Sequence, residues 1–274
     1  MHDIPAHDGN RQIDWGRTSG DYAQWRPDYP AEFYDRLAVT GVGLPGQRIL
    51  DLGTGVGFLA LNFARRGANV TGVDIAAGQV EQARETAAVN GLTIDFRVAD
   101  ATETGLPDSR FDVITASQAW LYFDQARAIS EVHRLLSPEG VLMVSHFCWL
   151  PRLDEVARRS EQLVQEFNPE WTAADWAGEI PEIPVWAVGR FKKTDGFVFD
   201  TRVPFTHESW RGRFRACRGV GASLTPDEVD RFDEAHAELL RRTVPEAFTV
   251  LHRIDCFVLK PLRSKPVEPP GKRA

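Results

Sequence analysis

Three alternate glycines, preceded by an acid at the end of an apolar run, are the residues of this sequence best suited to bind a ligand. The chain reads Ile-Leu-Asp-Leu-Gly-Thr-Gly-Val-Gly over residues 49–57. Alternate glycines allow positive φ angles and let a ligand approach the main chain without meeting a Cβ atom. The spacing G-x-G-x-G differs from the dinucleotide pattern G-x-G-x-x-G, whose last glycine would fall on Phe58. The sequence therefore predicts a buried strand that leads into a ligand loop lined by backbone.

Two further acids end later apolar runs at positions suited to a nucleoside. Asp74 lies 19 residues after Gly55, where a carboxylate can accept hydrogen bonds from two ribose hydroxyls. Ile75, which follows it, can lie against an adenine face. Asp100 can accept from the adenine amino group while the backbone N–H of Ala101 donates to a ring nitrogen. Each acid alone is typical of a turn or a helix N-cap, but three in this order with the glycine loop indicate a nucleoside site.

These features resemble the class I S-adenosylmethionine (SAM)-dependent methyltransferases, whose first motif reads acid-x-G-x-G-x-G. Asp51 and the loop glycines supply that motif. The segment Tyr22–Pro30 is similar to the Y-x-x-x-R-P-x-Y-P segment of a small-molecule group that includes ubiquinone-type C-methyltransferases and trans-aconitate methyltransferases. In that group the segment folds over the cofactor, which implies that Tyr22 and Arg26 lie near its methionine end. The resemblance extends from about Tyr22 to Leu259.

The resemblance implies S-adenosyl-L-methionine as the cofactor and a set of residues that contact it. These residues are Tyr22, Arg26, Asp51, Gly53, Thr54, Gly55, Gly57, Asp74, Ile75, Gln79, Asp100, Ala101, Ser117 and Gln118. No metal site is expected. His146 and Cys148 point to the same side at strand spacing, but no further ligand completes a site.

The sequence departs from this group at a position suited to proton transfer. Residues 116–124 resemble the group's A-x-Q-A-x-H-W-F-D, but Leu121 occupies the histidine position and Tyr122 the tryptophan position. Because histidine accepts a proton best near neutral pH, no general base is expected here. His146, at the end of a predicted strand on the ligand side, is the best placed alternative. The candidate catalytic residues are Tyr29, Tyr122 and His146, with His207 and Glu179 as further polar candidates.

Strand and helix signals alternate along the first half of the chain. The predicted strands are Arg48–Leu52, Asn69–Val73, Ile94–Val98, Phe111–Ala116 and Val141–His146. The predicted helices are Gly57–Arg66, Ala77–Asn90 and Asp124–Leu136, the last ended by a turn over residues 137–140. Continuously apolar strands between helices indicate a parallel sheet covered on both faces, with ligands at the carboxyl ends of the strands. We therefore expect an α/β, Rossmann-like, seven-stranded and mostly parallel sheet with helices on both faces.

After Trp149 the sequence becomes rich in aromatic residues and proline. We interpret residues 150–196 as a substrate cap insertion, although these aromatics could instead pack a small subdomain. A strand, two helices and a last strand then complete the sheet: Phe197–Phe205, about His207–Arg218, Pro226–Arg242 and Phe248–Leu259. The expected organisation is a disordered tail over 1–14, a SAM-binding core with an N-terminal lid over 15–149, the cap, the completion of the core over 197–263, and a disordered tail over 264–274.

Composition narrows the kinds of partner. The 274 residues carry a formal net charge of −7, which argues against nucleic acid. The basic cluster Arg211, Arg213, Arg215 and Arg218 is therefore interpreted as a solvated helix face. No apolar run is long enough for a membrane helix, and the N-terminus lacks a signal-peptide core. Three scattered cysteines are expected to be reduced thiols, which favours a cytoplasmic protein. The oligomeric state is not indicated.

The leading hypothesis is a SAM-dependent methyltransferase that acts on a small-molecule acceptor. A second hypothesis keeps SAM but directs attack to its methionine carbon chain, by aminocarboxypropyl transfer or by cyclisation to azetidine-2-carboxylate with release of methylthioadenosine. The absent histidine is compatible with that reaction, although no motif favours it. A third hypothesis is a protein that binds SAM without catalysis. A dehydrogenase is disfavoured by the glycine spacing.

Overall fold

The computed structural model describes residues 7–8 and 11–262. The elements in the first half are β1 (His7–Asp8), β2 (Arg11–Gln12), η1 (Trp15–Thr18), α1 (Ser19–Trp25), α2 (Ala31–Val39), β3 (Arg48–Leu52), α3 (Phe58–Arg65), β4 (Asn69–Asp74), α4 (Ala77–Val89), β5 (Asp95–Val98), β6 (Phe111–Ser117), η2 (Trp120–Tyr122) and α5 (Gln125–Leu135). The remaining elements are β7 (Leu136–Trp149), α6 (Glu155–Phe167), η3 (Val185–Ala187), β8 (Phe191–Thr206), α7 (His207–Arg215), α8 (Pro226–Thr243) and β9 (Ala247–Pro261).

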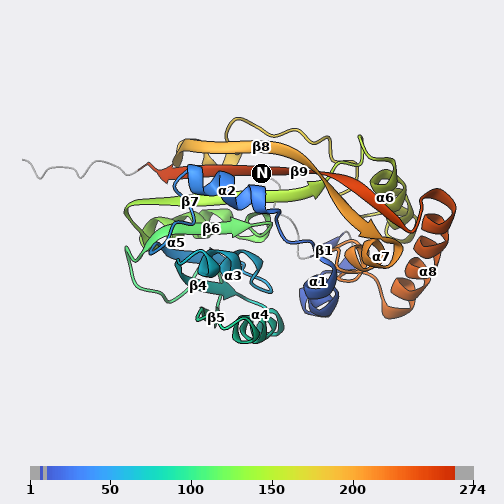
Figure 1. The fold of residues 1–274 in the computed structure, drawn as a ribbon, viewed down its shortest axis with the longest axis horizontal. Coiled ribbons are helices and arrows are strands. Elements are labelled where there is room, and N and C mark those ends of the chain that lie inside the picture. Colours follow the sequence, from blue (N-terminus) through green and yellow to red (C-terminus); the bar gives the residue numbers. More distant parts are fainter. Residues whose placement is uncertain (1–6, 9–10, 263–274) are drawn as a thin grey trace, which may run out of the picture.

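A seven-stranded sheet forms the centre of the molecule, with strand order β5-β4-β3-β6-β7-β9-β8 (Figure 1). The first five strands in this order pair in parallel, and β9 pairs antiparallel with both β7 and β8. The predicted mostly parallel sheet is therefore confirmed. The strand order reverses beside β3, so the loop after β3 lies at the switch point where open α/β sheets bind ligands.

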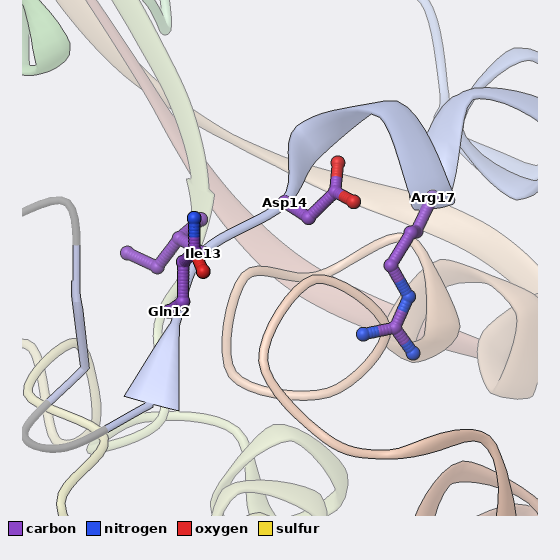
Figure 2. A pocket seen from close by; sticks show the side chains of 4 residues that line it. All are labelled: Gln12, Ile13, Asp14 and Arg17. Atoms are coloured by element: carbon purple, nitrogen blue, oxygen red, sulfur yellow. The ribbon is translucent and has the colours of Figure 1, made fainter.

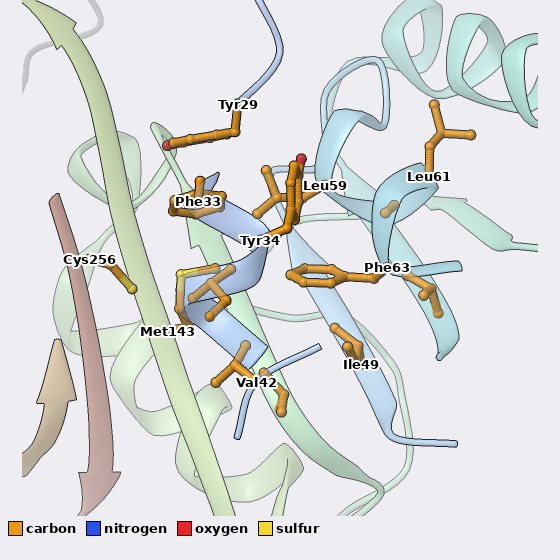
Figure 3. Close-up of a cluster of buried hydrophobic side chains, with 14 of the residues drawn as sticks. Tyr29, Phe33, Tyr34, Val42, Ile49, Leu59, Leu61, Phe63, Met143 and Cys256 are labelled. Carbon is orange, nitrogen blue, oxygen red and sulfur yellow. The ribbon is translucent and has the colours of Figure 1, made fainter. Parts of the chain in front are cut away.

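Alternate strand residues bury their side chains on opposite faces of the sheet. Ile49 packs with α2, α3 and α4 on one face, a cluster that includes the stacked rings of Tyr29 and Phe33 (Figure 3). Leu50 packs with α5 and η3 on the other face. This alternation follows from the pleat of a strand, and it explains why the strands read as continuously apolar.

The strands β7, β8 and β9 are longer than their neighbours, and helices α1, α6, α7 and α8 gather at the end toward which the parallel strands run (Figure 1). A third buried cluster joins Trp149, at the end of β7, to α6, α7 and α8. The helices α1 and α7 lie so close together that a Cβ atom on Gly212 would stand 2.2 Å from Cδ1 of Trp25. This helical group therefore forms a wall beyond the carboxyl ends of the core strands.

Most aromatic residues of the stretch after Trp149 pack inside the protein. Trp171 belongs to the helical cluster, whereas Trp186 lies 4.5 Å from Trp120, ring centre to ring centre, on the α5 face of the sheet. The stretch is thus divided between two packed regions. Whether residues 150–196 also cover a substrate stays a prediction.

Two details differ from the sequence-based expectations, and a third expectation falls outside the described residues. The predicted turn at 137–140 belongs to β7, where the pairing with β6 shifts register between Phe111 and Val113, so the extra residues form an irregularity within the strand. The expected N-terminal tail is partly structured, because β1 pairs with β2 and Arg11 forms an ion pair with Glu228 at 2.8 Å. The expected tail over 264–274 lies outside the described residues.

The basic cluster on α7 was wrongly interpreted as a solvated helix face. Arg211 and Arg215 both pair with Asp233 of α8, whereas Arg213 and Arg218 are buried. The physical reason is that α7 is packed between α1 and α8, which leaves it no fully solvated face.

Candidate functional site

The glycine loop joins β3 to α3 and adopts a backbone that side chains would not tolerate. Gly53, Gly55 and Gly57 all have positive φ angles, of 65°, 55° and 86°. A Cβ atom on Gly53 would lie 2.4 Å from the Cβ of Ala119, so the loop after β6 closes directly over this residue. The backbone at this loop is therefore both left-handed and tightly enclosed, as a backbone-lined ligand loop requires.

Asp51 supports the loop from below. Its carboxylate is buried and accepts hydrogen bonds from Thr54 Oγ1 at 2.7 Å and from Thr115 Oγ1 at 2.6 Å. Burial, together with the nearby charge of Asp74, raises the pKa of Asp51 to about 6. The carboxylate thus ties β3 to the loop and to β6.

Asp74 connects the end of β4 to the same loop. Its Oδ2 accepts from the backbone N–H of Gly55, and its Oδ1 accepts from that of Ala76, both at 2.9 Å. Burial raises the pKa of Asp74. Ile75 is 72% exposed beside it, and Gln79 is buried with Oε1 directed at Gly55. The glycine loop, Ile75 and Gln79 thus lie around one carboxylate, and their contacts with adenosine stay a prediction.

Asp100 lies beside this group but is engaged in a turn. The backbone N–H of Ala99 donates to the carbonyl of Asp74 at 3.0 Å, which brings the end of β5 next to β4. The exposed carboxylate of Asp100 accepts from both the backbone N–H and the hydroxyl of Thr102, at 2.7 and 2.8 Å. Ala101 is buried. The contacts with adenine that the sequence suggested for this pair stay predictions.

The segment between α1 and α2 folds over the glycine loop. Tyr22 stacks with Phe58 at a ring-centre distance of 6.4 Å, and the guanidinium of Arg26 lies 5.4 Å from the centre of the Tyr22 ring. Arg26 Nη2 donates to the carbonyl of Phe147 at 3.4 Å. A cleft is lined by this segment, the loop and the ends of β6 and β7. The predicted site residues that line it are Tyr22, Arg26, Tyr29, Asp51, Gly53, Thr54, Gly55, Ser117 and Gln118.

The tyrosine of this segment is held by two serines at the strand ends. The hydroxyl of Tyr29 lies 2.8 Å from Ser117 Oγ and 3.1 Å from Ser145 Oγ. Burial raises the pKa of Tyr29 above its ordinary value. Next to Ser117, Gln118 has a φ of 58°, which is uncommon for a residue with a side chain, and its amide lies 3.7 Å from Cys148 Sγ. The strand ends here are closely fixed.

His146 forms a pair with a residue that the sequence analysis did not single out. Its Nδ1 lies 2.9 Å from Oδ2 of Asp255, which is 1% exposed, and the two residues are direct partners across β7 and β9. Oδ1 of Asp255 has no hydrogen-bond partner within the described part of the chain. The sequence feature that could have identified Asp255 is its position as a lone acid in an apolar strand. Within the described ranges, no three metal-ligating side chains come together.

The other predicted candidates lie apart from this pair. Tyr122, in η2, is 42% exposed, and Leu121 precedes it where a histidine was sought. His207 is the first residue of α7, and its Nε2 lies 3.1 Å from the carbonyl oxygen of Val244, which is a contact at the end of the helix. Glu179 is exposed.

A second hollow lies before α1, away from the strand ends. It is lined by Gln12, Ile13, Asp14 and Arg17, whose side chains do not converge on one point (Figure 2). Asp14 Oδ1 accepts from the backbone N–H of Gly16 at 2.9 Å, and Arg17 Nη2 donates to the carbonyl of Leu224 at 2.8 Å. The charged side chains that line this hollow therefore have hydrogen-bond partners within the protein.

The sheet order, the glycine loop and the acid after β4 define a Rossmann-like domain of the class I methyltransferase kind. Residues 50–144 match a family model described as a methyltransferase domain. No helix of the described residues is long and apolar enough to cross a membrane.

Curated relatives match part of the chain. A demethylmenaquinone methyltransferase of Thermus thermophilus is 41% identical over 104 residues, which are 37% of this chain and 47% of that protein. An uncharacterised methyltransferase of Mycobacterium bovis is 32% identical over 164 residues, 56% of this chain and 63% of that protein. The chain thus spans between about half and just under two thirds of these relatives. A solved structure, a candidate type II methyltransferase from Anaeromyxobacter dehalogenans, has a TM-score of 0.58 at 23% identity and covers 85% of this chain and 97% of its own, which shows the shared fold.

Proposed function

We propose that this chain is a SAM-dependent methyltransferase that acts on a small-molecule acceptor. The observation that carries the proposal is the hydrogen bond from the backbone of Gly55 to Asp74, which builds the glycine loop and the acid into one site. The match of residues 50–144 to a methyltransferase domain supports it. The three free cysteines support a cytoplasmic location.

The residues present fit the cofactor. A carboxylate can accept about four hydrogen bonds, and Asp74 receives backbone N–H groups of Gly55 and Ala76 and also interacts with that of Ile75, so acceptor capacity remains for a ribose hydroxyl. Arg26 makes one long hydrogen bond to a carbonyl, so its other donors can bind the methionine carboxylate. Exposed Ile75 offers an apolar surface for adenine. When bound, SAM supplies an electrophilic methyl group on a positively charged sulfur.

We assign proton transfer to His146. Because Nδ1 faces Asp255, Nε2 is the ring atom available to accept a proton from the nucleophile of the acceptor. Asp255 is then a positioning residue that holds the ring orientation and stabilises the imidazolium. Tyr29 has a supporting role, because its hydroxyl is bound to two serines and burial disfavours its ionised form.

The test uses SAM carrying a labelled methyl group. Purified protein is incubated with this SAM alone and with a panel of small phenols, amines and thiols. We expect S-adenosylhomocysteine and a labelled product only when an acceptor is present. Methylthioadenosine from SAM alone would instead indicate attack on the methionine carbon chain, and SAM binding with neither product across the panel would indicate a binding protein. Either result would contradict the proposal.

A further inference from the structure

A buried cation on α7 lies next to the acceptor side of the proposed site. Arg213 is 5% exposed, and its guanidinium lies 4.8 Å from the centre of a Trp149 ring at the end of β7. Its Nη1 reaches only Cys217 Sγ, at 4.0 Å. Gly212, the residue before Arg213, packs against Trp25 of α1, and Tyr22 of the same helix lines the cleft, so Arg213 stands near the segment that covers the glycine loop.

The charge of Arg213 has no carboxylate counterpart in the described part of the chain. Its Nε has no hydrogen-bond partner there, and the groups that shift its pKa are Arg26, Tyr22 and the two thiols of Cys148 and Cys217. Burial and the charge of Arg26 lower the pKa of Arg213 to about 10, so it remains protonated near neutral pH. Burial raises the pKa of both thiols, which therefore stay uncharged.

The neighbouring arginines of the same helix, unlike Arg213, are paired with carboxylates. Arg215 donates to Asp233 at 2.6 Å and to Asp21 at 3.1 Å, and Arg211 also pairs with Asp233. The carboxylate of Glu161 raises the pKa of the neighbouring Cys217 thiol, but it does not pair with Arg213. Its two oxygens accept hydrogen bonds from Trp149 Nε1 at 2.6 Å and from the backbone N–H of Asp175 at 2.7 Å. Buried charges are normally paired, so Arg213 is the exception on α7.

We propose that Arg213 binds an anionic group of the acceptor, a carboxylate or a phosphate monoester, and thereby selects negatively charged acceptors. A guanidinium presents its Nε and Nη donors as a planar fork that matches two oxygens of such a group. Arg26 is already assigned to the methionine carboxylate, so the second buried cation is available for the acceptor. The charge of Arg26 acts on Arg213, and both arginines act on Cys148, so the two proposed anions would bind in the same region of the site. This inference rests on the proposed function.

The test measures binding of simple anions to the protein saturated with S-adenosylhomocysteine. Benzoate, phenyl phosphate and neutral benzamide are titrated by calorimetry at millimolar concentration. We expect benzoate or phenyl phosphate to bind and benzamide to bind at least about tenfold more weakly. The tighter of the two anions identifies the acceptor group as a carboxylate or as a phosphate.

Variants of α7 separate binding from folding. Arg213→Gln should lose anion binding by about tenfold or more, Arg213→Lys should keep part of it, and Arg211→Gln, a control that removes an ion-paired arginine of the same helix, should leave it unchanged. Arg213→Gln should not lower the thermal midpoint of the ligand-free protein, because it removes an unpaired buried charge. Equal binding of benzamide, no anion binding by the wild type, or an unchanged Arg213→Gln would overturn the inference. Failure to bind S-adenosylhomocysteine at all would instead overturn the proposed function.

Discussion

The imidazole of His146 and the carboxylate of Asp255 lie 2.9 Å apart as direct partners across the antiparallel strands β7 and β9. This pairing joins the parallel part of the sheet, which carries the cofactor loop, to a strand near the end of the chain. The half-buried ring and the fully buried acid are thus fixed by the register of two strands. The proposed base therefore does not depend on the η2 position, where Leu121 replaces the expected histidine.

Changing the histidine pair should slow turnover while leaving cofactor affinity intact. Once an acceptor is known, we expect His146→Ala to lower kcat by about 100-fold and Asp255→Asn by a smaller factor, on the order of tenfold. The double variant should be no slower than His146→Ala, because Asp255 acts through the ring. Asp200→Asn, on the adjacent strand β8, is the control. A full additive loss in the double variant would show that the two residues act independently.

The acid after β4 should account for part of the SAM affinity. Asp74→Ala should weaken SAM binding by about 1–3 kcal/mol, because ribose hydroxyls would lose a buried acceptor. Calorimetry measures this, with Asp95→Ala on the exposed part of β5 as the control. Unchanged affinity in Asp74→Ala would refute the ribose contact.

The close approach of the loop after β6 to Gly53 predicts a second effect on the cofactor site. Gly53→Ala should destabilise the protein by about 1–3 kcal/mol and weaken SAM binding, since the added Cβ is both strained and obstructed. Gly105→Ala is a matched control, because Gly105 has a similar φ of 67° but open space around it. Denaturant unfolding of both variants separates the two effects. If Gly105→Ala lowers the free energy of unfolding as much as Gly53→Ala does, backbone strain alone explains the loss of stability.

The buried acid beneath the loop predicts a pH dependence of stability. The pKa of Asp51 is about 6 in the folded protein against an ordinary value of 3.8, so the folded state holds this proton more tightly. Its contribution to the free energy of unfolding is therefore greatest below pH 4 and falls as pH rises toward 6, by up to about 3 kcal/mol. Denaturant unfolding from pH 4 to 7 should show this slope in the wild type and a weaker one in Asp51→Asn. Identical slopes would contradict the assignment.

The sequence predicted those features whose determinants are local. The strand Arg48–Leu52 and the loop after it were found because an apolar run, an acid and alternate glycines follow one another directly. The parallel sheet followed from the alternation of continuously apolar strands with helices. The helix positions were also close, since the predicted Ala77–Asn90 is observed as α4, Ala77–Val89.

The features that were missed depend on contacts between distant segments. Asp255 lies 109 residues from His146, and only the register of β7 and β9 brings them together. Arg213 was assigned to solvent from the overall acidity of the chain. It shares its helix face with buried Trp210, three positions earlier, which a check of helical spacing would have shown. Composition describes the surface on average, and it cannot identify a cation that packing encloses.

The close contact of α1 with α7 has a kinetic consequence. Trp25 lies against Gly212, while Tyr22, three positions earlier on α1, lies over Phe58 at the glycine loop. One short helix therefore touches both the cofactor side and the wall that carries Arg213. A displacement of α1 that uncovers the loop also disturbs that wall. We therefore expect release of the spent nucleoside of the proposed cofactor and binding of the proposed acceptor to be coupled through α1.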